Sequence, residues 1–451
     1  MTALIVDSVL TNAKAYFGGQ IVDCSIAIEE DKIQKIGKET QMPKADQKTD
    51  LHNLLVLPGL IDEHVHLRDE GRAYKEDFSS GTASAAAGGF TTVLDMPNND
   101  PVTMSLQTLQ TRMRVAQRKL LVNVGFFSEF PLNLVDAADI VAEGAVGFKL
   151  FMGNQTGGLN IDDEQALIDG SKEVARLKVP LAVHAEDRAM LAANEQKLKQ
   201  AKKSGTADLL RAHTEAVELK AIQRLLKASE QTNVQLHFCH VSTEEGLNTV
   251  ADAKKSGRKV TCEVTPNHLM LSTDDLKRYG SMVIMAPPLR SKLNVDALWK
   301  GIEDGSVDAL GSDHAPHAQS EKSASNIWDV KVGVPGLETT LPIMLTQIKK
   351  NKLTIVQAVH LLAERPAEIF SLNDRGRLEQ GKNADLTIVD FHHQFKIDAS
   401  KFKSKARFSP YNGWDVQGKA VKTIVNGQVV FDEGEIVAKG GCGFIVRRGN
   451  V

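Results

Sequence analysis

Eight short apolar runs that alternate with helical patterns constrain the fold of this 451-residue chain most strongly. They lie between Pro58 and Leu372 and read GLIDEHVH, FTTVLDM, LLVNVGFF, AVGFKLFM, VPLAVHAE, VQLHFCHVS, RKVTCEVT and VDALGSDH. The clearest helical pattern covers residues 207–231, where apolar residues recur at intervals of three and four. Eight alternating strands and helices predict an α/β fold with a closed (β/α)₈ barrel. An open doubly wound sheet is the alternative, but its usual GxGxxG fingerprint is missing.

The two ends of the chain have a different hydrophobic pattern. Residues 1–57 alternate short apolar runs with turns, beginning with ALIVDSVLTNA. Period-two patterns return in NADLTIVDFHH, KAVKTIVNGQVVFDEGEIV and GFIVRR. We therefore expect a small composite β-sandwich domain, built from residues 1–57 and 375–451, beside a barrel at residues 58–374. Two separate small sheets would give the same pattern.

Composition and charge narrow the class of protein. Hydrophobic residues make up 42%, charged residues 25%, and the net charge is −3, which is ordinary for a soluble globular protein. We expect no nucleic-acid partner and no membrane partner. The four cysteines form no CxxC motif, and the first apolar run is interrupted before it reaches the length of a signal peptide. These features predict a cytoplasmic protein, and they leave open whether it is a homo-oligomer.

Side chains that bind metals occur at the ends of the predicted barrel strands, where barrel enzymes place their active sites. The first run ends in His64 and His66, which are two residues apart and so point to the same side of a strand. The other candidate ligands are Lys149, His184, His240 and Asp313. Four histidines, an aspartate and a lysine would supply two divalent metal ions, and this ligand set suits zinc.

Lys149 needs a separate argument, because an ammonium group repels a metal ion. A lysine inside a barrel should have a partner or lose its charge. A neutral amine can capture carbon dioxide as a carbamate, whose two oxygens could bridge metal ions about 3.5–4 Å apart. The alternative is a lysine that emerges into solvent at the end of its strand.

Three other histidines have less definite predictions. His237 lies three residues before His240, so we expect it to be packed or to support a ligand. His213 lies in a segment expected to be at the surface, where a structural role is the simpler interpretation. The direction of His314 cannot be predicted.

The predicted ligand set indicates amide chemistry. Two metal ions with a shared hydroxide attack carbonyl carbons, and Asp313 could both bind a metal and carry a proton to the departing nitrogen. The same site acting in reverse would close a ring by dehydration. The stretch GTASAAAGG lacks the features of a P-loop, so phosphoryl transfer is not expected.

Three further side chains follow predicted barrel strands and form a candidate substrate site. They are Arg68, Asn98 in DMPNN and His317 in DHAPH. A guanidinium flanked by an amide and an imidazole is suited to bind a substrate carboxylate. Taken singly, Arg68 could be a surface ion-pair partner and Asn98 a turn residue.

Several motifs together resemble the cyclic amidohydrolases of the amidohydrolase superfamily, and most of all the dihydroorotases. They are PGLIDEHVHLR, KEDFSSGTASAAAGGFTTVLDMPN, GFKLFM, AVHAE, CHVS, PPLR, GSDHAPH, GVPGLETTLP and SPYNGW. The resemblance extends over nearly the whole chain.

This resemblance implies a (β/α)₈ barrel with a composite β-sandwich and two zinc ions per chain, bridged by carboxylated Lys149 and a hydroxide. It implies the reversible conversion of N-carbamoyl-L-aspartate to (S)-dihydroorotate in pyrimidine biosynthesis. It assigns the metals to the six predicted ligands, the general acid/base role to Asp313, and the substrate carboxylate to Arg68, Asn98 and His317.

The chain departs from the family pattern at a few positions. Residues 69–71 read DEG where EPG is common, Ala286 stands where asparagine often precedes PPLR, and Asn267 replaces a histidine. These changes affect the expected substrate contacts and no metal ligand. The alternatives are an allantoinase or a hydantoinase (dihydropyrimidinase), whose ring substrates lack the carboxylate. A more distant alternative is a non-catalytic homologue that acts as a scaffold.

Overall fold

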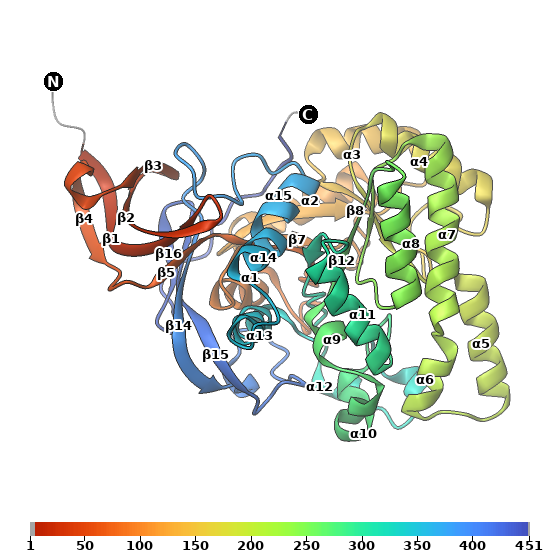
Figure 1. Cartoon of the computed structure of the whole chain (residues 1–451). Coiled ribbons are helices and arrows are strands. Elements are labelled where there is room, and N and C mark those ends of the chain that lie inside the picture. The colour runs from red at the N-terminus through yellow and green to blue at the C-terminus, as the bar shows by residue number, and fades with distance from the viewer. Residues whose placement is uncertain (1–4, 450–451) are drawn as a thin grey trace.

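Two β-sheets organise the molecule, as the computed structural model of residues 5–449 shows (Figure 1). One is an eight-stranded parallel sheet in which consecutive strands are neighbours. Its strands are β6 Leu60–Val65, β7 Phe90–Asp95, β8 Asn123–Ser128, β9 Gly147–Phe151, β10 Leu181–His184, β11 Leu236–Phe238, β12 Val260–Val264 and β13 Ala309–Leu310. Each of the eight predicted runs overlaps one of these strands, and seven of them contain the whole strand.

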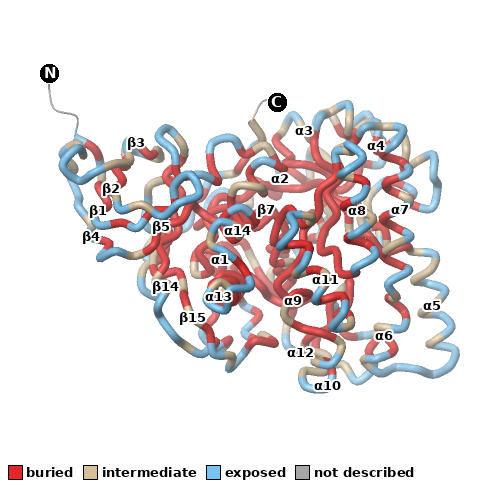
Figure 2. Tube along the Cα trace, in the orientation of Figure 1, coloured by how far each residue is buried: buried red, intermediate tan, exposed pale blue. Residues whose placement is uncertain are grey.

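The sheet closes on itself next to the predicted site. Val65 forms a parallel bridge with His314, and the amide of His66 donates to the His314 carbonyl at 2.9 Å. The strand residues are almost all buried, which explains why the runs are continuously apolar instead of alternating (Figure 2). The predicted (β/α)₈ barrel is therefore confirmed.

Helices follow each barrel strand and cover the outside of the sheet (Figure 1). The longer ones are α1 Phe78–Ala87, α2 Leu106–Gln117, α3 Ala137–Glu143, α4 Glu164–Arg176, α5 Arg188–Gln200, α6 Thr206–Ala212, α7 Glu215–Thr232, α8 Glu244–Lys255, α11 Lys292–Glu303 and α13 Leu337–Lys349. Shorter helices are α9 Pro266–Met270, α10 Leu276–Tyr279, α12 Gln319–Lys322, α14 Ile355–Val359 and α15 Arg365–Ile369. Among the described residues, no helix combines the length and apolar composition needed to cross a membrane.

The second sheet has nine strands and draws on both ends of the chain. Its strands are β1 Ile5–Phe17, β2 Gln20–Glu29, β3 Lys32–Gly37, β4 Lys44–Asp50, β5 Leu55–Pro58, β14 Leu386–Lys396, β15 Asp415–Val425, β16 Gln428–Asp432 and β17 Glu435–Ile436. The two ends meet where β5 pairs antiparallel with β14. The composite architecture is thus confirmed over the alternative of two separate sheets. The domain boundaries at residues 57 and 374 stay a prediction, and residues 3–4 of the first predicted strand lie outside the described residues.

Two local predictions were wrong. The segment GFIVRR does not join the composite sheet; Phe444 and Val446 instead hydrogen-bond to Val124 of β8, at the barrel. The helical pattern at residues 207–231 is broken into α6 and α7 at His213 and Thr214. The break has a physical cause, because the His213 side chain turns inward to pair with Glu186.

Candidate metal centre at the barrel mouth

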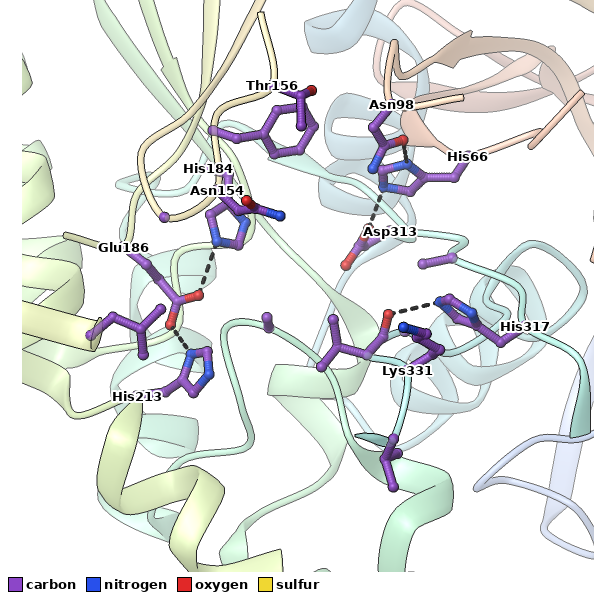
Figure 3. Close-up of a pocket in the computed structure, with 18 of the residues that line it drawn as sticks. His66, Asn98, Asn154, Thr156, His184, Glu186, His213, Asp313, His317 and Lys331 are labelled. Carbon is purple, nitrogen blue, oxygen red and sulfur yellow. Dashed lines mark hydrogen bonds and ion pairs between the residues drawn. The ribbon is translucent and has the colours of Figure 1, made fainter. Parts of the chain in front are cut away.

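The predicted ligands converge at the carboxyl ends of the barrel strands. His64 lies in β6, His66 just after it, and His184 at the end of β10, while His240 and Asp313 follow β11 and β13. These five side chains line a cavity of about 880 Å³. Figure 3 shows three of them, His66, His184 and Asp313. Lys149, in β9, is fully buried and is not among the residues that line the cavity. The parallel strands therefore bring together residues that are up to 249 positions apart in the chain.

The four imidazole rings form a continuous chain. The ring centroids are 5.4 Å apart between His66 and His64, 5.1 Å between His64 and His240, and 4.8 Å between His240 and His184. Nδ1 of His184 lies 3.1 Å from Nε2 of His240. Two ring nitrogens at this separation can share one ion with bonds of about 2.0–2.1 Å.

Asp313 faces the other pair of histidines. Its Oδ1 lies 3.2 Å from Nε2 of His66 and 3.5 Å from Nε2 of His64. Burial acts to raise the pKa of Asp313, but the neighbouring His64 and His66 outweigh it and hold that pKa well below its usual range. The carboxylate is therefore ionised near neutral pH, as a metal ligand must be.

Two of the histidines, His66 and His240, are held neutral by their surroundings. Burial lowers the pKa of His66 to about 3, and burial together with His184 places the pKa of His240 well below its usual value. Neutral imidazole is the form that coordinates metals. Nδ1 of His240 is buried and has no hydrogen-bond partner among residues 5–449. These ring nitrogens are therefore better suited to bind a metal ion than to form hydrogen bonds with one another.

Lys149 lies beside one of the predicted ligands, His64, and beside Cys239. Its Nζ lies 3.4 Å from Nε2 of His64 and 2.8 Å from Sγ of Cys239. In the described part of the chain it forms no ion pair with a carboxylate. A buried ammonium without a counterion is costly, so the position of Lys149 requires an explanation.

Carboxylates and an amide behind the histidines fix their orientation. Glu263 of β12 accepts from Nδ1 of His64 and from the amide of His240. Asn98 Oδ1 accepts from Nδ1 of His66 at 2.8 Å, and Glu186 lies 2.9 Å from Nε2 of His184. Such partners determine which ring nitrogen faces the metal.

Glu263, Glu186 and His213 also support the site, although none of them was predicted to do so. Glu186 bridges His184 and His213, whose Nδ1 lies 2.6 Å away, so His213 belongs to the cavity wall (Figure 3). The expected surface position of His213 was therefore wrong. A signal was present in AVHAE, because Glu186 lies two residues after His184 and can point to the same side. His237 does support the site, since its Nε2 contacts Glu263 at 3.2 Å.

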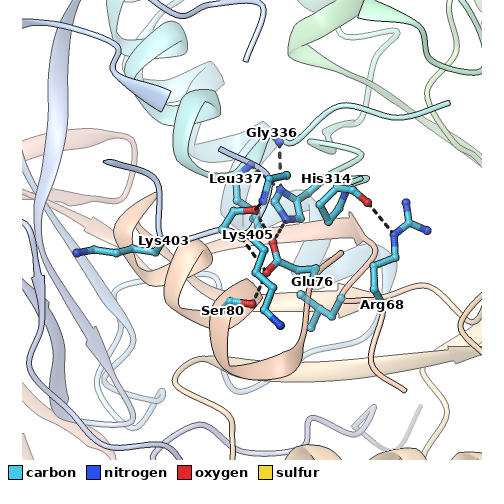
Figure 4. A network of polar contacts seen from close by, with 12 residues as sticks. Arg68, Glu76, Ser80, His314, Gly336, Leu337, Lys403 and Lys405 are labelled. Carbon is cyan, nitrogen blue, oxygen red and sulfur yellow. Dashed lines mark hydrogen bonds and ion pairs between the residues drawn. The ribbon is translucent and has the colours of Figure 1, made fainter. Parts of the chain in front are cut away.

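His314 points away from the cavity, although it follows Asp313 directly. Its Nε2 lies 3.3 Å from the buried Glu76, and its Nδ1 accepts from the amide of Gly336 (Figure 4). Glu76 also accepts from the hydroxyl of Ser404, which comes from the segment between β14 and β15. This network fixes the turn that carries Asp313.

Three site residues have strained backbone conformations. The φ angles are +62° at Arg68, +37° at His240 and +45° at Asp313. Residues other than glycine rarely adopt positive φ, and when they do so in groups they commonly belong to functional sites. The strain lies at the turns that follow β6, β11 and β13.

The three predicted substrate-binding residues all line the cavity, but they are not equally free. Arg68 donates from Nε to the Pro316 carbonyl at 3.2 Å, and burial lowers its pKa to about 10, so it remains charged at neutral pH. The side-chain oxygen of Asn98 accepts a hydrogen bond from His66, which leaves the side-chain amide nitrogen available as a donor. His317 is engaged at both ring nitrogens, by Lys75 at 3.1 Å and by the Val332 carbonyl at 2.9 Å.

The chain is similar in sequence to a known family and to several known proteins. Residues 55–430 match the model of the Amidohydrolase family. A dihydroorotase from Methanosarcina acetivorans is 36% identical over 443 residues, which cover 96% of this chain and 94% of that protein. A dihydroorotase from Pyrococcus horikoshii is 35% identical and covers 97% and 95% of the two chains.

A solved structure is also similar. The L-hydantoinase (dihydropyrimidinase) from Arthrobacter aurescens superimposes with a TM-score of 0.94, at 32% identity, over 98% of this chain and all of that one. The two chains therefore share the same overall fold.

Proposed function

Because the chain belongs to the amidohydrolase family, we propose that it is a dihydroorotase, which interconverts N-carbamoyl-L-aspartate and (S)-dihydroorotate in pyrimidine biosynthesis. The observation that carries the proposal is a metal-ligand set with a charged guanidinium, Arg68, on the wall of the same cavity. The names of the curated relatives, which are similar over nearly the whole chain, support the same activity.

The proposed cofactor is a pair of divalent ions, for which zinc suits the donors. His64, His66 and Asp313 would hold one ion, His184 and His240 the other, and carboxylated Lys149 would bridge them. When bound, the ions lower the pKa of a water and polarise the substrate carbonyl.

Asp313 is positioned to move the proton that the reaction requires. Hydrolysis of the ring must take a proton from the attacking water and deliver one to the departing ring nitrogen. The Asp313 carboxylate is ionised and borders the cavity beside His64 and His66, so it can accept the first proton and then donate it. In the direction of ring closure the same group acts in reverse.

Arg68 and Asn98 are the proposed partners of the substrate carboxylate. The two terminal nitrogens of Arg68 and the amide nitrogen of Asn98 are donors at the cavity wall, and a guanidinium can bind a carboxylate with two hydrogen bonds. His317 is the proposed third partner. To bind the carboxylate, it would have to give up one of its present hydrogen bonds. Lys75, which contacts His317, is a further cation near this position.

A hydantoinase is the second candidate, and the shape of the cavity favours it specifically. The cavity is near the upper end of the usual range for small-molecule sites, about 300–1,000 Å³. Part of its wall is apolar, formed by Phe151, Leu191, Leu209, Ile327 and Trp328. A wall of this kind could accept the apolar substituent of a hydantoin, whereas dihydroorotate has none.

Turnover of purified enzyme supplied with zinc and bicarbonate separates these candidates. We expect hydrolysis of dihydroorotate and ring closure of N-carbamoyl-L-aspartate. Hydrolysis of allantoin or a substituted hydantoin, with dihydroorotate untouched, would overturn the proposal. Absence of turnover together with far less than one metal ion per chain would indicate the scaffold.

Replacing Arg68 by Met tests the carboxylate site. We expect KM for dihydroorotate to rise by at least about tenfold, because a charge-assisted pair is lost, while the metal content stays the same. The matched control is Arg114→Met at an exposed position of α2. Loss of metal from Arg68→Met would show that this arginine supports the metal centre instead.

A further inference from the structure

Lys322 is a fully buried lysine that the chemistry proposed above does not use. Its side chain has no exposed surface, and no carboxylate in the described residues forms an ion pair with it. Its Nζ donates instead to three main-chain carbonyls, those of Ile284 at 2.8 Å, Lys331 at 2.9 Å and Gly333 at 3.0 Å. Lysines are almost never fully buried without a charged partner, so this position requires an explanation.

The three carbonyls satisfy an ammonium group completely. An ammonium has three N–H donors and no lone pair, whereas a neutral amine would turn its lone pair toward a carbonyl oxygen. Burial lowers the pKa of Lys322 to about 7. The three acceptors oppose that effect and favour the charged form, since hydrogen bonds to a charged group stabilise it.

The acceptors belong to segments that form the wall of the substrate cavity. Lys331 and Gly333 lie on either side of Val332, and all three line the cavity. The amide of Gly333 also donates to the Ile284 carbonyl at 2.9 Å, which joins this segment to the one that leads to Ala286. Lys322 therefore ties together two stretches of the wall that are distant in sequence.

These hydrogen bonds connect Lys322 to His317. The Val332 carbonyl, between the two carbonyls that Lys322 binds, lies 2.9 Å from Nε2 of His317. Because a carbonyl can only accept, the contact with Val332 favours the hydrogen of His317 on Nε2, and Nδ1 can then accept from Lys75 at 3.1 Å. Nδ1 also lies 3.3 Å from Oε2 of Glu321, a longer contact that competes for a hydrogen on this nitrogen. Arg68 lies on the same side, with Nη2 3.4 Å from Nε2 of His317, a longer contact in which a protonated Nε2 does not accept.

We propose that Lys322 is a positioning residue: its ammonium, held by three carbonyls, fixes the segment 331–333, and the Val332 carbonyl then sets the tautomer and orientation of His317 beside Arg68. Lys322 does not touch the substrate and acts only through this segment. The predicted effect on substrate binding rests on the proposed function, whereas the effect on His317 does not.

The test compares Lys322→Met, which is unbranched, one atom shorter and without donors, with Lys300→Met at an exposed position of α11. In ¹⁵N-histidine spectra, wild-type His317, assigned with His317→Gln, should show a single Nε2–H tautomer. Lys322→Met should lose it and Lys300→Met should keep it. For dihydroorotate, Lys322→Met should raise KM at least tenfold and change kcat less than threefold, with metal content unchanged.

An unchanged His317 tautomer, or a KM within twofold of wild type, would overturn the role of Lys322. If wild-type enzyme leaves dihydroorotate untouched, the proposed function fails and the spectra alone decide this inference. If Lys322→Met does not fold, Gly333→Ala replaces it. Gly333 has a φ of +140°, and an added Cβ would lie 2.5 Å from the Ala315 carbonyl and 3.1 Å from Cδ2 of His317. The tautomer should then be lost in Gly333→Ala, and its retention would contradict the proposal.

Discussion

Lys149 has an imidazole and a thiol for neighbours, where a buried lysine would normally require a carboxylate. The sequence predicts that Lys149 lies inside a barrel strand. A lysine at such a position should have a charged partner or lose its charge. What the sequence could not show is the contact with Cys239, because the two residues come from different strands. A carbamate on Lys149 would remove the unpaired cation and supply two oxygens to the ligands around it.

Replacing Lys149 by Ala should abolish this bridge. We expect the loss of at least one metal ion per chain and a fall in turnover of more than about 100-fold, because both ion sites share the ligand. Metal analysis and steady-state kinetics measure these effects, with Lys172→Ala at an exposed position as the control. A short carboxylic acid with zinc should restore part of the activity, and unchanged turnover would refute the bridging role.

At the scale of elements, sequence patterns located the eight barrel strands but not the contacts between distant segments. Period and composition are local properties, so they predict strands well and predict their partners poorly. Two examples show the limit. GFIVRR has the period-two pattern of a sheet strand, yet it pairs with β8 of the barrel. The helical pattern of residues 207–231 contains no sign of the contact with Glu186, which His213 makes at the break between α6 and α7. The ligands themselves were predictable because parallel strands place their carboxyl ends together.

The contact between the C-terminal segment and β8 can be tested at Val446, which is 4% exposed. Val446→Ala should lower the free energy of unfolding by about 1–3 kcal/mol, because a buried aliphatic side chain is shortened. Denaturant unfolding provides the measurement. Phe444, which is 50% exposed, gives the matched control, since Phe444→Ala should change the stability by less than about 0.5 kcal/mol. Equal effects at the two positions would contradict this arrangement of the segment.

At the scale of the whole molecule, a buried polar network joins the barrel to the composite-sheet part of the chain (Figure 4). Glu76 accepts from Ser404, and Glu338 of α13 accepts from the amides of Lys403 at 2.8 Å and Ser404 at 3.1 Å. Glu76 also contacts His314, next to Asp313. The segment between β14 and β15 therefore contributes to the geometry of the site without lining it, which a sequence pattern does not show.

Glu338 gives this junction a dependence on pH. Burial raises the pKa of Glu338 to about 7, with a smaller contribution from Glu76, so the folded protein binds this proton more tightly than the unfolded chain. The resulting stabilisation is complete below about pH 4.5 and is lost as the pH rises through 7. The stability of wild type relative to Glu338→Gln should therefore fall by up to ~3 kcal/mol between pH 4.5 and 8. Unfolding at several pH values measures it, with exposed Glu303→Gln as the control; a difference that grows with pH would contradict the assignment.

The proposed metal centre consists of six side chains from five barrel strands, arranged around two metal ions. Anomalous X-ray diffraction from crystals of the zinc-loaded protein tests it directly, because the scattering locates each ion independently of activity. We predict two peaks about 3.5–4 Å apart, one beside His64, His66 and Asp313 and one beside His184 and His240, with density for a carboxylated Lys149 between them. Crystals with no peak at the barrel mouth, or with zinc bound elsewhere, would contradict it.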